Sequence, residues 1–172
     1  IFNFNAPNFI LRFALGETDY QLGVTDYERF AAEYYYLERD VWQQELNLTV
    51  QEKGKLVMLL EENYRPENRI YRYNFFYDNC ATRPRDLIEK SIDGTLQYAG
   101  DMTDTDSGIS FRDLLHKYSK GHPWSRFGMD LCMGSQADRT INRRLMMFVP
   151  FYVQEYFNQA RIVNKEGETR PL

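Results

Sequence analysis

The chain has 172 residues, a net charge of −4 and 16% aromatic residues. This length predicts one domain with a full hydrophobic core, and the aromatic content excludes a disordered or low-complexity segment. The basic residues are dispersed, which argues against a nucleic-acid partner, and no apolar run approaches the roughly 18 residues of a membrane span.

The beginning of the chain resembles the inside of a strand. Ile1-Phe2-Asn3-Phe4 alternates, with neither an initiator methionine nor a signal peptide before it. We therefore expect the chain to be a processed or truncated piece of a longer protein. Residues 1–22 mix alternation with turn signals, which predicts short strands and a helical turn.

Capping boxes and apolar periodicity predict the helices. Thr25 with Glu28 starts a helix to about Tyr36, and Thr49 with Glu52 starts a second that ends near residue 63. Further helices are predicted over 82–91, 110–118, 124–133 and 150–160.

The remaining segments predict strands and loops. Alternation over 40–48 predicts a strand with one solvated face, and residues 69–76 form a short β-like aromatic run. Residues 95–108 are predicted to form a polar loop, and residues 164–172 a frayed polar tail. The fold class is therefore α+β, helix-rich, with a single domain over 1–163.

Cys80 follows the aromatic run and precedes a predicted helix with Thr82 as its N-cap and Pro84 in its first turn. The helix macrodipole, together with Arg83 and Arg85, favours the thiolate, which is the nucleophilic form. Open N–H groups of this turn are the donors that an oxyanion hole needs. The alternative is that Cys80 is a small packed hydrophobe beside an ordinary cap. The two arginines have their own alternatives: they bind an anionic substrate, or they are solvated residues.

The other cysteine and the histidines offer little support for catalysis. Cys132 is distant in sequence, and a disulfide with Cys80 would consume the best nucleophile, so we expect none. His116 and His122 are too few and too scattered for a metal site, and neither is in a convincing position for a base. We therefore expect no metal and no cofactor. Either the base lies upstream of Ile1, or Cys80 is not catalytic.

Two aromatic stripes are interpreted as core. The first covers residues 71–77, and its alternative is that part of it lines a channel for an acyl chain. The second covers residues 148–152, and its alternative is contact with a membrane surface. The helix that follows is not basic on its polar face, which favours packing.

A resemblance to a known family adds to this interpretation. The stretch 73–86, with its core Asp78-Asn79-Cys80-Ala81-Thr82-Arg83, resembles the signature of the Lnb N-terminal periplasmic domain, formerly a domain of unknown function. Supporting similarities lie in residues 5–9, 46–49, 66–69, 111–114, 123–124 and 127–128. The resemblance covers nearly the whole chain, although Pro84 stands where an aliphatic residue is expected.

The resemblance implies a papain-like domain of the permuted NlpC/P60 type, with a small antiparallel sheet. In such domains the catalytic histidine precedes the cysteine, and here its Gly-His-Ser segment would lie upstream of Ile1. The fragment by itself would then lack its base. The resemblance also implies a bacterial, exported protein in the periplasm or cell envelope, close to the membrane.

The name-bearing members are lipoprotein N-acyltransferases. This implies acyl transfer from a phospholipid to Cys80 and then to the N-terminus of a lipoprotein. Asn79 and Thr82 would support the site or form the oxyanion hole, and Arg83, Arg85 and Tyr77 would bind substrate. Two alternatives remain: a thiol amidase or peptidase acting on the cell wall or other amides, and a non-catalytic binding or assembly domain.

Overall fold

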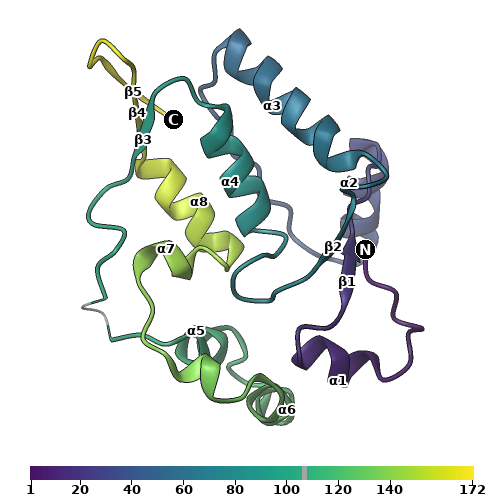
Figure 1. The fold of residues 1–172 in the computed structure, drawn as a ribbon. Helices are drawn as coiled ribbons and strands as arrows, with labels where there is room; N and C mark the ends of the chain where they lie inside the picture. Colours follow the sequence, from purple (N-terminus) through teal and green to yellow (C-terminus); the bar gives the residue numbers. More distant parts are fainter. Residues whose placement is uncertain (106–107) are drawn as a thin grey trace.

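Helices and a few short strands make up the chain, whose computed structural model describes residues 1–105 and 108–172 (Figure 1). The helices are α1 Phe9–Ala14, α2 Tyr27–Tyr36, α3 Val50–Tyr64, α4 Thr82–Ser91, α5 Phe111–Tyr118, α6 Pro123–Met133, the 3₁₀ helix η1 Ser135–Asp138, α7 Arg143–Met146 and α8 Pro150–Gln159. The strands are β1 Asp19–Gln21, β2 Ile70–Arg72, β3 Thr95–Gln97, β4 Arg161–Val163 and β5 Thr169–Pro171. This arrangement confirms the predicted helix-rich α+β class.

Of the two helix starts predicted from capping boxes, the one at Thr49 is confirmed in its side-chain detail, and the structure adds a second box at the helix start predicted near residue 110. Thr49 and Glu52 cap α3 reciprocally, and Ser110 and Asp113 do the same for α5. The box predicted at Thr25 is wrong, because α2 has Asp26 as its N-cap and no side-chain capping bond. Helix α2 nevertheless covers the predicted residues.

The strands form two small antiparallel sheets. Strand β1 pairs with β2, so that Tyr20 lies opposite Tyr71, and β3, β4 and β5 form the second sheet in that order. The second sheet contains two segments predicted as irregular. The predicted polar loop begins with β3, and its residues 106–107 lie outside the described part. The predicted frayed tail is instead the second half of the β4–β5 hairpin, because Leu172 is buried beside Ile162.

The strand predicted over 40–48 is absent, since this segment forms neither helix nor strand. Its alternation has a different cause. Leu46 and Leu48 pack against the core beside β4 and α8, and Gln44, on the same side of the segment, donates a hydrogen bond to Asn158 of α8 over 2.6 Å. The alternate residues Gln43, Glu45 and Asn47 are exposed. The period of two therefore reflects which side chains face the rest of the protein, and the segment pairs with none of the described strands.

Two clusters of buried side chains form the core, one on either side of the 146–149 segment. The first joins α5, η1 and the aromatic run around Phe76, whose ring stacks on Phe111 at a centroid distance of 4.2 Å. The second joins α8, the end of α4 and β4 around Phe157 and Ile162. Figure 1 shows α4 between α3 and α8, so the helix that follows Cys80 lies at the centre of the molecule.

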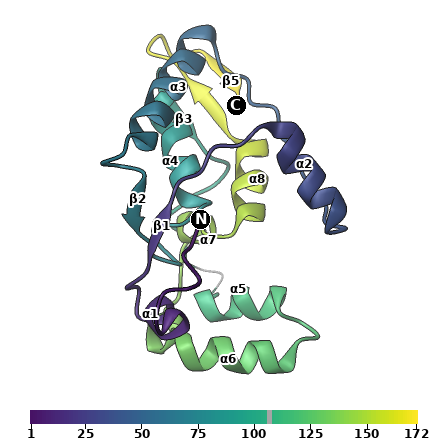
Figure 2. The same ribbon diagram turned by 90° about the vertical axis from the view of Figure 1, so that its right-hand side faces the viewer.

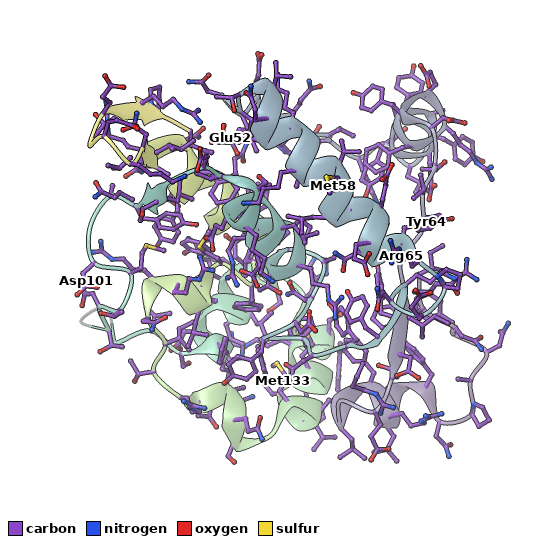
Figure 3. The ribbon with its side chains drawn as sticks, turned by 45° about the horizontal axis from the view of Figure 1, so that its top comes forward. Glu52, Met58, Tyr64, Arg65, Asp101 and Met133 are labelled. Carbon is purple, nitrogen blue, oxygen red and sulfur yellow. The ribbon has the colours of Figure 1, made fainter. Side chains whose placement is uncertain are left out.

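A buried carboxylate fixes the upper end of this arrangement. Glu52 accepts hydrogen bonds from the amides of Thr49 and Asp93, over 2.7 and 3.0 Å, and from the guanidinium of Arg170. Figure 3 shows Glu52 at the start of α3, on the side of the β3–β5 sheet. This one side chain thus links α3, the end of α4 and the C-terminal hairpin.

Candidate functional site around Cys80

Cys80 is exposed and lies in the turn that leads into α4. Asn79 and Thr82 lock this turn reciprocally. The backbone N–H of Asn79 donates to the Thr82 hydroxyl over 2.8 Å. The side-chain oxygen Oδ1 of Asn79 accepts from the backbone N–H groups of Ala81 and Thr82 over 2.8 and 2.9 Å. Helix α4 therefore begins at Thr82 itself, with Ala81 at the N-cap, one residue earlier than the predicted cap.

Asn79 also ties the turn to the core. Its side-chain nitrogen donates to the carbonyls of Phe75 and Phe148 over 2.9 and 2.8 Å, and the residue is 3% exposed. An asparagine amide has two N–H donors, and both are used here. Asn79 thus has no donor left for an oxyanion, and its geometry suits the supporting part of the predicted role.

The amides of this turn define where an oxyanion could bind. The N–H groups of Ala81 and Thr82 are occupied by Asn79, the N–H of Arg83 donates to the Asn79 carbonyl over 3.2 Å, and Pro84 has none. The amide of Cys80 forms no hydrogen bond with any residue in the described part of the chain. It is consequently the one donor of the turn that a developing oxyanion could use.

The two arginines after Cys80 have protein partners. Arg83 forms a bidentate pair with Asp78 at 2.6 and 2.8 Å, and its guanidinium lies 3.2 Å from the centroid of the Tyr71 ring. Arg85 is buried and pairs with Asp86 at 2.7 Å. Their charges are therefore partly neutralised by these carboxylates, and their role in substrate binding stays a prediction.

Tyr20, Tyr71 and Tyr73 lie near the sulfur, on the side of the β1–β2 sheet. Tyr71 and Tyr73 belong to the aromatic stripe that was interpreted as core, whereas no pattern in the sequence had indicated Tyr20. Tyr73 is buried and close enough to Cys80 for the charge of a thiolate to act on its hydroxyl, and the Tyr20 ring lies 5.4 Å from the Tyr73 ring. Burial, followed by the charge of the Cys80 thiolate, raises the pKa of Tyr73, and burial raises the pKa of Tyr71 to about 12. These hydroxyls thus remain protonated donors at neutral pH.

A cavity of about 410 Å³ opens on the other side of Cys80. One wall consists of residues from α4 and α8, and the other of α2 and residues 40–44; Figure 2 shows α2 beside α8. Most of the lining is apolar, with Trp42 and Phe151 as its large exposed side chains. The polar exceptions are Asp40, Gln44 and Gln154.

The residues of the two aromatic stripes differ in burial. Tyr73 and Phe76 are buried, as are Phe148 and Val149, whereas Phe151 is exposed and lines the cavity. Tyr77 does not line it, because its ring packs edge-on against Phe111 and its hydroxyl accepts a hydrogen bond from Arg139 over 3.3 Å. A substrate-binding role for Tyr77 therefore stays a prediction.

The remaining candidate groups lie elsewhere. His116 Nε2 lies 2.8 Å from Asp130 Oδ1, between α5 and α6, and His122 occupies the N-cap of α6; neither lines the cavity. Cys132 is exposed on α6, and both cysteines are free. Over residues 1–105 and 108–172, no group of three His, Cys, Asp or Glu side chains could hold a metal ion.

Comparison with known proteins identifies one family. The sequence profile of the Lnb N-terminal periplasmic domain matches residues 1–117, a range that includes Cys80 and every predicted site residue. No curated protein and no solved structure matches the chain. The family is a periplasmic domain, which confirms the predicted localisation in the periplasm or cell envelope. Among the described residues, no helix is long and apolar enough to cross a membrane.

Proposed function

Because the chain belongs to the Lnb N-terminal periplasmic domain family, we propose that it transfers acyl groups through a thioester at Cys80, as the periplasmic domain of a lipoprotein N-acyltransferase. The observation that carries the proposal is the position of the thiol. An exposed cysteine at the start of a central helix opens into a cavity with mostly apolar walls. Such walls suit a hydrocarbon chain, because each buried methylene contributes about 0.8 kcal/mol.

The proposed reaction has two steps. The Cys80 thiolate attacks the ester carbonyl of a phospholipid; a C–S bond forms, the C–O bond to glycerol breaks, and the leaving oxygen takes a proton. The free amine of a lipoprotein N-terminus then attacks the thioester; a C–N bond forms, the C–S bond breaks, the amine loses a proton, and the thiolate is restored. Covalent catalysis of this kind divides one difficult transfer into two easier ones.

The residues around the sulfur have distinct proposed roles. The Cys80 amide binds the developing oxyanion, because it has no other partner in the described structure. Asn79 and Thr82 hold the turn, and the Tyr73 hydroxyl lies near enough to the sulfur to be influenced by the thiolate charge. The base that takes the thiol proton is expected upstream of Ile1, by family resemblance, since neither histidine lines the cavity.

Intact mass spectrometry tests the proposal. The 172-residue chain and a version extended upstream to include the Gly-His-Ser segment are incubated with phospholipid vesicles. We expect the extended protein to gain an acyl mass that hydroxylamine removes. Cys80→Ser abolishes this gain, whereas Cys132→Ser, which removes the other exposed thiol, retains it. An extended protein without any labile adduct would contradict the transferase.

A thiol amidase is the second candidate, because the cavity also has the polar side chains of Asp40, Gln44 and Gln154, which could bind a peptide backbone. It uses the same nucleophile but transfers the acyl group to water. Its product is a free acid, whereas the transferase produces an acylated amine, so mass analysis of the products separates the two. A non-catalytic domain would instead show equal alkylation rates at Cys80 and Cys132.

A further inference from the structure

Helix α6 presents an apolar face to solvent. Trp124, Phe127 and Leu131 are 86%, 62% and 75% exposed. Their spacing of three and then four residues places them on one side of α6. Figure 2 shows α6 at the end of the molecule, with α5 between it and the rest of the fold. These three residues do not belong to the core, whereas Met133 of α6 and the buried residues of α5 do.

The stripe continues onto α1, which contacts α6. Phe4, Leu11 and Leu15 are also mostly exposed. Together with Leu131 they line a hollow of about 870 Å³ between the two helices. A contiguous apolar surface of this kind marks an interaction site on a soluble domain. We call it the α1–α6 face.

The segments that carry the α1–α6 face are opposite in net charge to the rest of the chain. Residues 1–16 and 111–139 contain six basic and three acidic residues, whereas the remainder contains 15 basic and 22 acidic. All three acidic side chains are already engaged: Asp130 and Asp138 bind Arg112, and Asp113 caps α5. The other basic side chains form no ion pair with a carboxylate in the described structure; they are Arg12, Lys117, Lys120, Arg126 and Arg139.

We propose that the α1–α6 face docks on the surface of an anionic phospholipid bilayer. Tryptophan and phenylalanine partition into the boundary between head groups and acyl chains, and flanking Lys and Arg attract anionic lipids. A second copy of the chain would fit this face less well, because two basic surfaces would repel each other. The proposal is independent of the thioester chemistry, since none of these residues lines the Cys80 cavity.

Co-sedimentation with vesicles tests this docking. The 172-residue chain is mixed with vesicles that contain phosphatidylglycerol, and separately with vesicles of phosphatidylcholine alone. We expect binding to the anionic vesicles that weakens with salt. Replacing Trp124, Phe127 and Leu131 with serine should lower the partition coefficient about tenfold or more. A Lys120→Gln, Arg126→Gln variant should lower it about fivefold for each charge removed.

The matched control lies on another exposed helix. Val50, Val57 and Met58 of α3 are also largely exposed, and Figure 3 places Met58 well away from Met133 at the end of α6. Replacing these three with serine should leave vesicle binding unchanged. Circular dichroism shows whether each variant folds. If the apolar variant does not fold, the Lys120→Gln, Arg126→Gln variant still tests the proposal.

Three results would overturn the proposal. The first is absence of binding by the unmodified chain to anionic vesicles. The second is an equal loss of binding in the α3 control, which would indicate non-specific adsorption. The third is a concentration-dependent dimer that the α6 variant abolishes while lipid binding is absent, which would assign the α1–α6 face to a second copy.

Discussion

The two walls of the Cys80 cavity are built differently. The α4–α8 wall belongs to the core: Asn79 joins the Cys80 turn to Phe148, and α8 contributes the buried Phe157. The α2 wall has no buried residue in its helix, and residues 37–49 that follow it form no regular element. The position of the sulfur is therefore coupled to global stability, whereas the opposite wall can vary with little effect on folding.

The two walls suit two different requirements of the site, which are a fixed nucleophile and an adaptable binding surface. A nucleophile needs a fixed geometry, and buried hydrogen bonds supply it because each one is costly to break. A wall that admits different acyl chains needs surface side chains that do not support the core. Three substitutions test this division, beginning with the one that should affect stability most.

Asn79→Ala should have the largest effect on the α4–α8 wall. It removes two donated and two accepted hydrogen bonds in a buried turn and leaves the carbonyls of Phe75 and Phe148 without these partners. We expect a loss of about 3 kcal/mol in the free energy of unfolding, measured by urea denaturation. Gln44→Ala, which removes surface hydrogen bonds of the other wall, should cost less than about 0.5 kcal/mol. Similar losses in both variants would contradict the comparison.

Glu52→Gln should lower the free energy of unfolding by about 2 kcal/mol at pH 7, because Glu52 links α3 to the end of α4, a helix of the α4–α8 wall. Burial alone would raise the pKa of Glu52, but hydrogen bonds from Thr49 and Asp93 and from the Arg170 guanidinium hold it below the ordinary 4.5. A folded-state pKa below the unfolded value contributes stability above about pH 4.5, and this is lost as the pH falls through the folded value.

Unfolding curves for the unmodified chain and Glu52→Gln, recorded from pH 3 to pH 7, test whether the Glu52 carboxylate stabilises or destabilises the fold. The difference between the two proteins should be largest at neutral pH and shrink on acidification. A difference that grows below pH 4.5 would show that the carboxylate destabilises the fold. Glu61→Gln, at an exposed position on the same helix, is the control and should match the unmodified chain.

Trp42→Ala should have the smallest effect on stability and a visible one on substrate choice. Trp42 lines the cavity but is largely exposed, so the free energy of unfolding should change by less than about 0.5 kcal/mol. If the cavity holds the acyl chain, thioester formation should slow several-fold for long-chain phospholipids and little for short-chain ones. Equal slowing for both lengths would argue against an acyl-binding wall.

Local patterns in the sequence were sufficient for much of this protein. The capping box at Thr49 and the helix predicted from residue 110 mark real helix starts, and Cys80 does precede a helix that begins at Thr82. These features depend on residues within a few positions of one another, which is the range over which capping and periodicity act. The α+β class follows from the same local information.

Contacts between distant segments were decided only by the tertiary structure. The bond from Asn79 to Phe148 spans 69 residues, the cavity combines Trp42 with Phe151, and Tyr20 reaches the Cys80 side through its pairing with Tyr71. Alternation at 71 and 73 could have indicated that these tyrosines share one face, but not that the face is turned to the sulfur. Periodicity specifies which side of an element is buried, whereas the partner that buries it depends on how the whole chain packs.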